Sequence, residues 1–295
     1  MRVSELGERI RYLGAGLRKL WYMMLTTAWS QLLFAYGAVL QLVEIVFGIA
    51  SYFFLTKIFQ GTSAVMESYG TDVVSFIVLG LAMNSILRHS LTGVYHALNH
   101  AYATRALERV LMSPTSVYML VFSQMASGYL RAVFVSTLYL FAGVLFFGVS
   151  LGRGDAASVF AALALGTVAT LGLGMLLSAL FFYTSVGKVD PATILILATA
   201  VSNTFTGAVF PVEVLRYYAP WLYPFALSLP QTHAIFAARM ALNGVSLADP
   251  SVAPSVAYLA AVAAVTIPVG YRVIRAGLDR VRREGYAPSV AVLVD

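Results

Sequence analysis

Cysteine is absent from the chain, and charged residues are scarce. Without cysteine there can be no disulfide, no thiolate metal site and no thiol redox chemistry. Charged residues make up 11% of the 295 residues, whereas a soluble domain carries about 25%. Hydrophobic residues reach 60%, which is more apolar surface than a soluble fold of this size can bury. The composition therefore predicts a protein that is solvated by lipid along much of its length.

The common nucleotide-binding and hydrolase motifs are missing as well. The phosphate-binding loop G-x-x-x-x-G-K-[ST] requires a lysine followed by serine or threonine. The lysines of this chain are followed by leucine, isoleucine and valine; they are Lys19, Lys57 and Lys188. HExxH and a carboxylate-rich metal loop are absent too. We therefore expect no ATP hydrolysis by this chain through such a loop, and no catalytic residues or cofactor of its own.

Histidine is rare, and its spacing raises the question of a metal. His96 and His100 have the i, i+4 spacing of two ligands on one face of a helix. No carboxylate lies close to them in the sequence. We therefore expect no metal site.

What the sequence does have is six apolar stretches long enough to cross a bilayer. A hydrocarbon core of about 30 Å needs roughly 20 apolar residues in a helix. The second stretch is the least regular, because Asn84, Arg88 and His89 interrupt it. The expected fold is an all-α integral membrane protein, a single transmembrane domain over 1–295. Its six transmembrane helices are predicted at 32–55, 73–97, 120–147, 157–182, 192–210 and 256–274.

Basic residues mark the ends of these stretches that are expected to face the cytoplasm. The net charge is +6, and arginine and lysine gather before the first stretch, between the second and third, between the fourth and fifth, and after the sixth. The positive-inside rule then places both termini in the cytoplasm, which requires an even number of crossings. Because the positive charge flanks apolar runs, we attribute it to membrane topology and expect no nucleic-acid partner.

The segment 1–30 is predicted to form an amphipathic helix on the cytoplasmic surface of the membrane. Apolar residues recur there at steps of three and four, and most of the basic residues fall elsewhere on the helix. The alternative is that the segment continues into the first transmembrane helix. The apolar positions are Ile10, Leu13, Leu17, Leu20 and Met24.

Small residues repeat every four positions in the fourth stretch. Such a stripe lets two helix backbones approach closely. Packing inside one subunit is the favoured interpretation, and a contact between two subunits is the alternative. The residues are Gly166, Thr170, Gly174 and Ser178.

The segment 211–251, between the fifth and sixth stretches, lies outside by this topology but is apolar and aromatic. Its prolines are too closely spaced for one unbroken helix. We expect short helices that re-enter the outer leaflet, where irregular backbone must be covered by protein or line a wet cavity. The alternative is an aromatic belt at the interface with no role in transport. The prolines are Pro211, Pro220, Pro224 and Pro230.

Glu44 falls near the middle of the first predicted transmembrane helix, and Arg88 falls inside the second. The two helices run in opposite directions, so the side chains are expected at similar depth. A charge left alone in lipid costs roughly 2.5–3.5 kcal/mol or more. We therefore predict that Glu44 and Arg88 form an intramembrane ion pair. The alternative is that each finds its own polar partner or water.

Two stretches of the sequence resemble one family of transporters. The first, 103–116, reads ATRALERVLMSPTS, and its matching residues are Leu107, Glu108, Val110, Leu111, Pro114 and Ser116. Arg105 and Ala106 stand where that family often has Gly-Thr. The second is 207–244, where the matching residues are Gly207, Phe210, Pro211, Trp221, Leu222, Pro230 and Arg239. The pattern resembles the permease subunits of bacterial and archaeal ABC exporters of the type two class, which have the type V exporter fold.

The resemblance implies a partner and a place where it binds. A separate ATP-binding cassette ATPase would hold ATP and Mg and would dock on a short coupling helix in the cytoplasmic loop 98–116. An amphipathic helix laid in a groove is a common mode of recognition. The alternative is a surface helix that lies on lipid. The residues expected at this ATPase contact are Arg105, Leu107, Glu108, Arg109 and Leu111.

The resemblance also implies a second permease subunit, identical or related, and a transport path between the two. The cargo would be amphipathic, lipid-like or drug-like, and the location a prokaryotic plasma membrane, with a cytoplasmic tail at 276–295. The rival functions are a stand-alone secondary carrier or channel, and a membrane-embedded enzyme or assembly factor. The residues expected along the path or at its outer gate are Phe210, Pro211, Trp221, Tyr223, Phe225 and Pro230.

Overall fold

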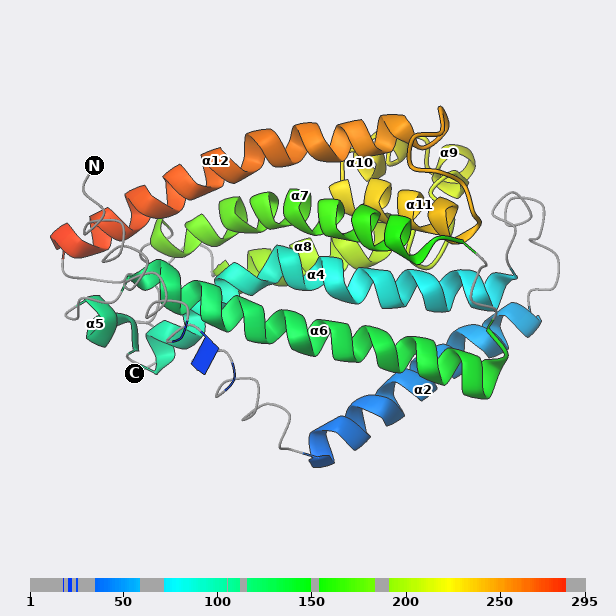
Figure 1. Cartoon of the computed structure of the whole chain (residues 1–295), viewed down its shortest axis with the longest axis horizontal. Coiled ribbons are helices and arrows are strands. Elements are labelled where there is room, and N and C mark those ends of the chain that lie inside the picture. The colour runs from blue at the N-terminus through cyan, green and yellow to red at the C-terminus, as the bar shows by residue number, and fades with distance from the viewer. Residues whose placement is uncertain are drawn as a thin grey trace, which may run out of the picture.

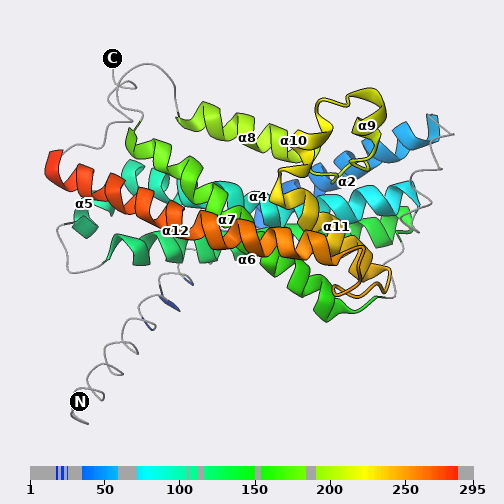
Figure 2. The same ribbon diagram turned by 90° about the horizontal axis from the view of Figure 1, so that it is seen from above.

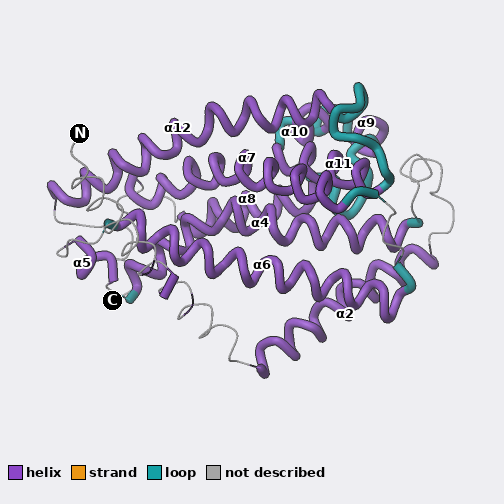
Figure 3. The backbone as a smooth tube through the Cα atoms, viewed as in Figure 1, coloured by secondary structure: helices purple, strands orange, loops and turns teal. Residues whose placement is uncertain are grey.

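The computed structural model describes residues 18, 21, 22, 25, 35–58, 72–104, 106–111, 116–149, 154–183 and 191–284. These residues form helices and the loops between them, without a strand (Figures 1 and 3). The helices are α2 (Ala35–Ile58), α4 (Val73–Ala103), α5 (Ala106–Leu111), α6 (Val117–Phe147), α7 (Ala156–Tyr183), α8 (Pro191–Phe205), α9 (Val214–Tyr218), α10 (Tyr223–Leu227), α11 (Pro230–Leu242) and α12 (Ala253–Glu284).

A helix lies at each of the six positions predicted for a membrane crossing. Within the described residues, α4, α6, α7 and α12 are long and apolar enough to span a bilayer, while α2 and α8 contain shorter apolar helical stretches. The described part of the chain is therefore all-helical, and the chain is a multi-pass membrane protein. Crossings by α2 and α8 stay a prediction. The sixth helix is ten residues longer at its end than the sequence indicated, because its last three turns are polar and extend beyond the apolar run.

The long helices run side by side along the long axis of the molecule (Figure 1). The short helix α5 lies at one end, which we call the inner end, and α9, α10 and α11 lie toward the other, the outer end. Seen from above, α7 lies between α12 and α8 (Figure 2), as it does in Figure 1. The positive-inside rule predicts that the inner end is cytoplasmic.

Close backbone contact between α7 and α4 explains the small-residue stripe of the fourth stretch. A Cβ on Gly174 would lie 2.5 Å from the carbonyl oxygen of Ser90 and 2.6 Å from that of Leu91. A Cβ on Gly166 would collide with Ala234 of α11. All four residues of the stripe are buried. The prediction of packing within one subunit is confirmed.

The opposite face of α7 is held against α12 in the same way. A Cβ on Gly172 would collide with Thr266, and one on Gly270 would lie 2.7 Å from Met175. Further along, Gly277 leaves room for the ring of Phe182. Glycines on two faces of α7 thus bring α4 and α12 close to it on both sides.

The helix α2 packs against the bundle through its middle and outer turns. Ile45 and Ile49 are buried in one cluster with Val78 of α4 and with Ala142 and Val149 at the outer end of α6. Toward the inner end, α2 diverges from α6 (Figure 1). The hydrophobic contacts of α2 in this cluster therefore begin at Leu42.

The outer segment consists of three short helices, as the proline spacing predicts. Pro224 lies in the first turn of α10 and Pro230 in the first turn of α11, where the missing N–H is not needed. In α11, Ala234, Ile235 and Ala238 are buried against α7 and α12. Protein therefore covers this irregular region, and its re-entry into the outer leaflet stays a prediction.

Other predictions concern the inner end. The interfacial helix at 1–30 lies outside the described residues, apart from four helical positions whose side chains are exposed: Arg18, Trp21, Tyr22 and Leu25. The short helix expected in the loop 98–116 is present as α5. Of the tail at 276–295, the part up to residue 284 belongs to α12 and the rest lies outside the described residues.

The contact between α7 and α4 can be tested by adding one methyl group. We expect Gly174→Ala to lower the thermal unfolding temperature of the detergent-purified protein, because two helix backbones must separate. Overpacking of this kind costs about 1–3 kcal/mol. The matched control is Gly48→Ala in α2, where nothing lies within 4 Å of the added Cβ. Equal unfolding temperatures for the two variants would contradict the packing described here.

Candidate functional site

A polar furrow runs along α4 between α2, α6 and α8. It consists of two adjoining cavities, an inner one of about 660 Å³ and an outer one of about 330 Å³. Both are lined by Ser85 and Arg88, so they form one continuous depression. The inner part extends to His100, near the inner end of α4, and the outer part extends to Phe210, in the loop that follows α8.

The furrow exists because α4 has one polar face. Along the helix, polar side chains recur at steps of four residues and all of them line the furrow, so they share one side of the helix. The other side carries apolar residues such as Leu87 and Leu98, which are fully buried. The recurring polar residues are Asn84, Arg88, Thr92, His96 and His100.

The neighbouring helices complete the walls. From α6, the lining residues recur at steps of three and four, and they are Gln124, Gly128, Arg131, Val135 and Tyr139. From α2 come Gln41 and Tyr52, and from α8 come Thr199, Asn203 and Thr204. Most of these side chains can form hydrogen bonds, although the helices that carry them are apolar as a whole.

His89 fixes α4 to α6 in the floor of the inner part. Its Nε2 lies 3.3 Å from the carbonyl oxygen of Met125, to which it donates in the matching tautomer. The ring meets Tyr129 edge-on at 4.8 Å between centroids, and the Tyr129 hydroxyl donates to Ser90 Oγ at 2.8 Å. A Cβ on Gly128 would collide with the His89 ring. The imidazole thus fills a slot that only a glycine leaves open.

The outer part of the furrow carries a hydrogen bond between α4 and α8. Asn84 Nδ2 donates to Asn203 Oδ1 at 2.9 Å. Asn84 is 4% exposed, and its own Oδ1 has no hydrogen-bond partner among the described residues. A buried acceptor without a partner is costly. The bond between Asn84 and Asn203 thus joins α4 to α8 at the cost of one unsatisfied amide oxygen.

Two arginines lie in the furrow near the middle of long helices. Arg88 is at the midpoint of α4, and Arg131 is one residue from the midpoint of α6. Both side chains are exposed to the furrow. Within the described part of the chain, neither guanidinium donates a hydrogen bond or forms an ion pair.

The predicted partner of Arg88 lies on α2. Glu44 accepts a hydrogen bond from Gln41 Nε2 at 3.3 Å. The charges of Glu44 and Arg88 both act on the phenol of Tyr139, so the two side chains lie on the same side of α6. No direct ion pair joins them among the described residues, and their pairing stays a prediction.

The residues predicted to contact an ATPase lie at the inner end. The backbone of 106–111 is helical, and Arg109 Nη2 donates to the carbonyl oxygen of Thr104 at 2.9 Å. Arg105 and the side chains of Leu107, Glu108 and Leu111 lie outside the described residues.

The residues predicted along the path or at an outer gate are divided among the furrow, the protein interior and the surface. Phe210 lines the outer part of the furrow. Pro211 and Pro230 are buried, whereas Trp221 is 77% exposed. Phe225 meets Phe205 edge-on at 6.1 Å between ring centroids, and Tyr223 packs in the same small cluster. Of these six residues, Phe210 is the one that the structure brings to the described furrow lining.

A buried arginine anchors the outer segment to the rest of the helix bundle. Arg239 of α11 is 6% exposed, and its guanidinium donates to the carbonyl oxygens of Gly207 at 2.6 Å and of Ala208 and Phe76 at 2.9 Å. It also lies 3.4 Å from the centroid of the Phe76 ring. A Cβ on Gly80 would collide with this guanidinium. One side chain thus connects α11, the loop after α8 and the outer end of α4.

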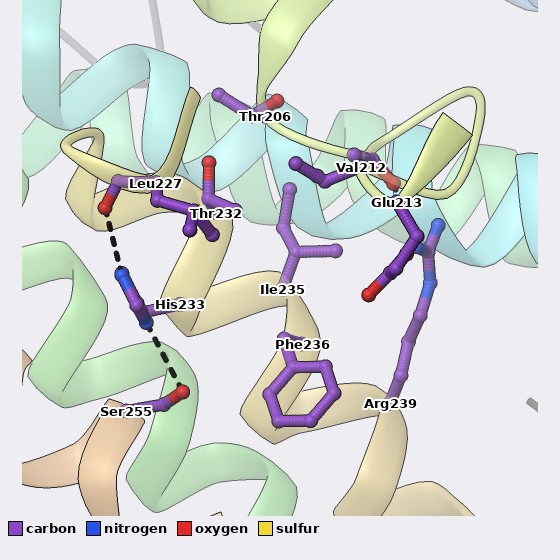
Figure 4. Close-up of a pocket in the computed structure, with 11 residues that line it drawn as sticks. Thr206, Val212, Glu213, Leu227, Thr232, His233, Ile235, Phe236, Arg239 and Ser255 are labelled. Carbon is purple, nitrogen blue, oxygen red and sulfur yellow. Dashed lines mark hydrogen bonds between the residues drawn. The ribbon is translucent and has the colours of Figure 1, made fainter. Parts of the chain in front are cut away.

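A small cavity of about 180 Å³ separates α11 from this loop (Figure 4). On one side of it, His233 lies between two partners: its Nε2 donates to the carbonyl oxygen of Leu227 at 2.9 Å, and its Nδ1 accepts from the Ser255 hydroxyl at 3.0 Å. The ring also packs on Tyr258 of α12. These contacts hold α10 and α11 against α12 and identify the cavity as a structural feature of the outer segment.

Sequence reasoning missed the furrow, although a signal was present. The polar residues within 73–97 counted as interruptions of a transmembrane helix, but their steps of four place them on one face. On α6, Gln124 and Arg131 are seven residues apart, which is two helical turns. What the sequence could not show is that these two faces point toward each other.

The described residues contain no group of three or more histidine, aspartate or glutamate side chains that could hold a metal ion. Searches with protein-family models and among curated proteins found no match to this chain. The geometry of the furrow is therefore the basis for a functional proposal.

Access of water to the furrow can be tested with two single-cysteine variants, because the chain has no cysteine of its own. Val135→Cys lines the furrow, whereas Val133→Cys, two residues away on the same helix, is exposed on another face. We expect a charged methanethiosulfonate reagent to modify Val135→Cys and to leave Val133→Cys unmodified, because thiolates form in water and not in lipid. Equal labelling of the two cysteines would contradict a polar furrow.

The role of Arg239 can be tested by Arg239→Met. This change leaves three buried carbonyl groups without their charged donor, and each such hydrogen bond is worth about 1.5–3 kcal/mol. We expect a clearly lower unfolding temperature and faster hydrogen exchange in 206–229. Arg216→Met, at an exposed arginine of α9, serves as the control and should behave as wild type. An unchanged unfolding temperature for Arg239→Met would show that the outer segment is held by other contacts.

Proposed function

We propose that this chain is the membrane-spanning subunit of an ATP-driven exporter of the type two ABC class, and that the furrow along α4 forms one side of its translocation path. The cargo is an amphipathic, lipid-like or drug-like molecule. ATP and Mg are bound by a separate ATPase subunit. The proposal includes six crossings, with both chain ends in the cytoplasm of a prokaryotic cell.

One observation carries this proposal. A continuous polar furrow connects the inner part of an otherwise apolar bundle with the loop that leads into the outer segment. Polar side chains at membrane depth are expensive and usually face the inside of a bundle or a water-filled cavity. A row of polar side chains over several helical turns contributes little to the stability of the bundle, but it provides hydrogen-bonding groups for a polar group that passes along it.

Two features support an ATPase partner in place of an energy source within the chain. The sequence carries no phosphate-binding loop. The short helix α5 lies at the inner end (Figure 1), at the position where the family resemblance implies a coupling helix. A helix that moves α4 and α6 from their inner ends would act directly on two walls of the furrow.

A second permease subunit fits the shape of the furrow. The furrow is walled by α2, α4, α6 and α8 of one chain and remains open on one side. A second copy, or a related chain, would close it and keep lipid out. Two such subunits and two ATPase subunits would form the working exporter.

A stand-alone secondary carrier or channel is the second candidate. The arginines and histidines within the furrow favour it, because ionisable groups inside a membrane often mark ion pathways. The two candidates differ in their energy source. Transport driven by an ion gradient with the purified chain alone would support the carrier and overturn the exporter.

The partner can be identified by purifying the tagged chain from its native membrane. We expect it to carry along an ATPase of about 200–300 residues that contains the phosphate-binding loop. Leu107→Asp and Glu108→Arg in α5 should release this ATPase and reduce export, because they change the proposed docking surface. The control is Arg216→Glu at the outer end, which should retain the partner. Full ATPase binding by both α5 variants would exclude the coupling role.

A further inference from the structure

The inner part of the furrow carries charge of one sign. Its described lining contains two arginines and three histidines, and no aspartate or glutamate. The charges of Arg88, Arg131 and His96 all act on His89, so these groups lie close together. Glu44 on α2 is hydrogen-bonded by Gln41 of the lining and offsets at most one of the two arginine charges. The inner part is therefore electrostatically positive.

The two arginines are costly to keep at this depth without a partner. An arginine near the centre of a transmembrane helix costs about 2.5–3.5 kcal/mol or more. Neither guanidinium has a hydrogen bond or ion pair among the described residues, and both side chains project into a cavity of about 660 Å³. Guanidinium groups bind carboxylates and phosphates with two parallel hydrogen bonds. An anionic group in the furrow would satisfy both arginines at once.

The described helices α2 and α6 separate beside the inner part of the furrow (Figure 1). The described packing of α2 on α4 and α6 begins at Leu42, and the first turns of α2 diverge from α6 (Figure 1). The diverging helix carries exposed apolar side chains, Val39, Val43 and Phe47. A hydrocarbon chain can lie against these side chains while a polar group attached to it occupies the furrow.

We propose that the inner part of the furrow binds the anionic headgroup of a membrane amphipath, which enters sideways between α2 and α6 from the inner leaflet. Arg88 and Arg131 bind its phosphate or carboxylate, and His96 lines the same space. The apolar tail remains between α2 and the lipid. This inference rests on the proposed transport function and names the class of its cargo.

Lipid binding by the purified chain alone tests the inference. Fluorescent phosphatidylglycerol and phosphatidylcholine with identical acyl chains are titrated against the protein in a non-ionic detergent. We expect wild type to bind the anionic lipid about tenfold more tightly, and Arg88→Gln combined with Arg131→Gln to reduce this preference to about twofold. The control is Arg275→Gln, which removes one exposed positive charge from α12 outside the furrow and should keep the tenfold preference.

Further variants and a competitor distinguish the remaining outcomes. If the double variant does not fold, His96→Glu places a negative charge on an exposed furrow residue and should remove the preference by itself. Inorganic phosphate at constant ionic strength should not displace the lipid, because it lacks the tail. Displacement by phosphate would indicate a soluble anion as the ligand. An undiminished preference for the anionic lipid in both variants would place lipid binding elsewhere. Either result overturns the inference.

The assay is independent of the ATPase. Equal binding of the two lipids by wild type, together with normal copurification of the ATPase, would overturn the anionic cargo and leave the exporter intact. Selective binding without any ATPase partner would retain the anionic site and contradict the exporter.

Discussion

The structure depends on the two different faces of α4. This helix is the most buried of the four that are long and apolar enough to span a bilayer. On one side its backbone touches α7 at Gly174, and lipid or water has no access there. On the other side its polar residues need partners, because a bilayer provides none. The helices α2, α6 and α8 surround this polar face. Their outward faces are apolar, and the polar side that they enclose forms the furrow.

The two ends of the furrow are built by different means. At the outer end, Arg239 binds backbone carbonyl groups from three places in the chain, so the loop after α8 is held by one buried charge. Its partners are backbone atoms, which no substitution elsewhere can remove. At the inner end, the divergence of α2 leaves the walls apart.

The sequence predicted the helices well and the site poorly. Six apolar runs and the proline spacing in the outer segment led to the correct helix positions, because these features depend on local composition and on backbone geometry. The close packing of Gly174 was also foreseen from its spacing. The furrow depends instead on which faces of α4 and α6 meet, and this is decided by non-local contacts such as the fit of His89 against Gly128. Arg239 matched a family pattern, yet only the fold reveals its three carbonyl partners.

The glycines on both faces of α7 have a consequence for motion. Because α4 and α12 touch α7 at the level of the backbone, the three helices form one rigid body, and α6 is attached to it through His89. Sliding within this body would force backbone atoms into each other. By contrast, α2 is attached along half its length and α8 through Asn203 and a few neighbours. A displacement of α5 would therefore carry α4 and α6 along with this frame, and the width of the furrow would change as the frame moves relative to α2 and α8.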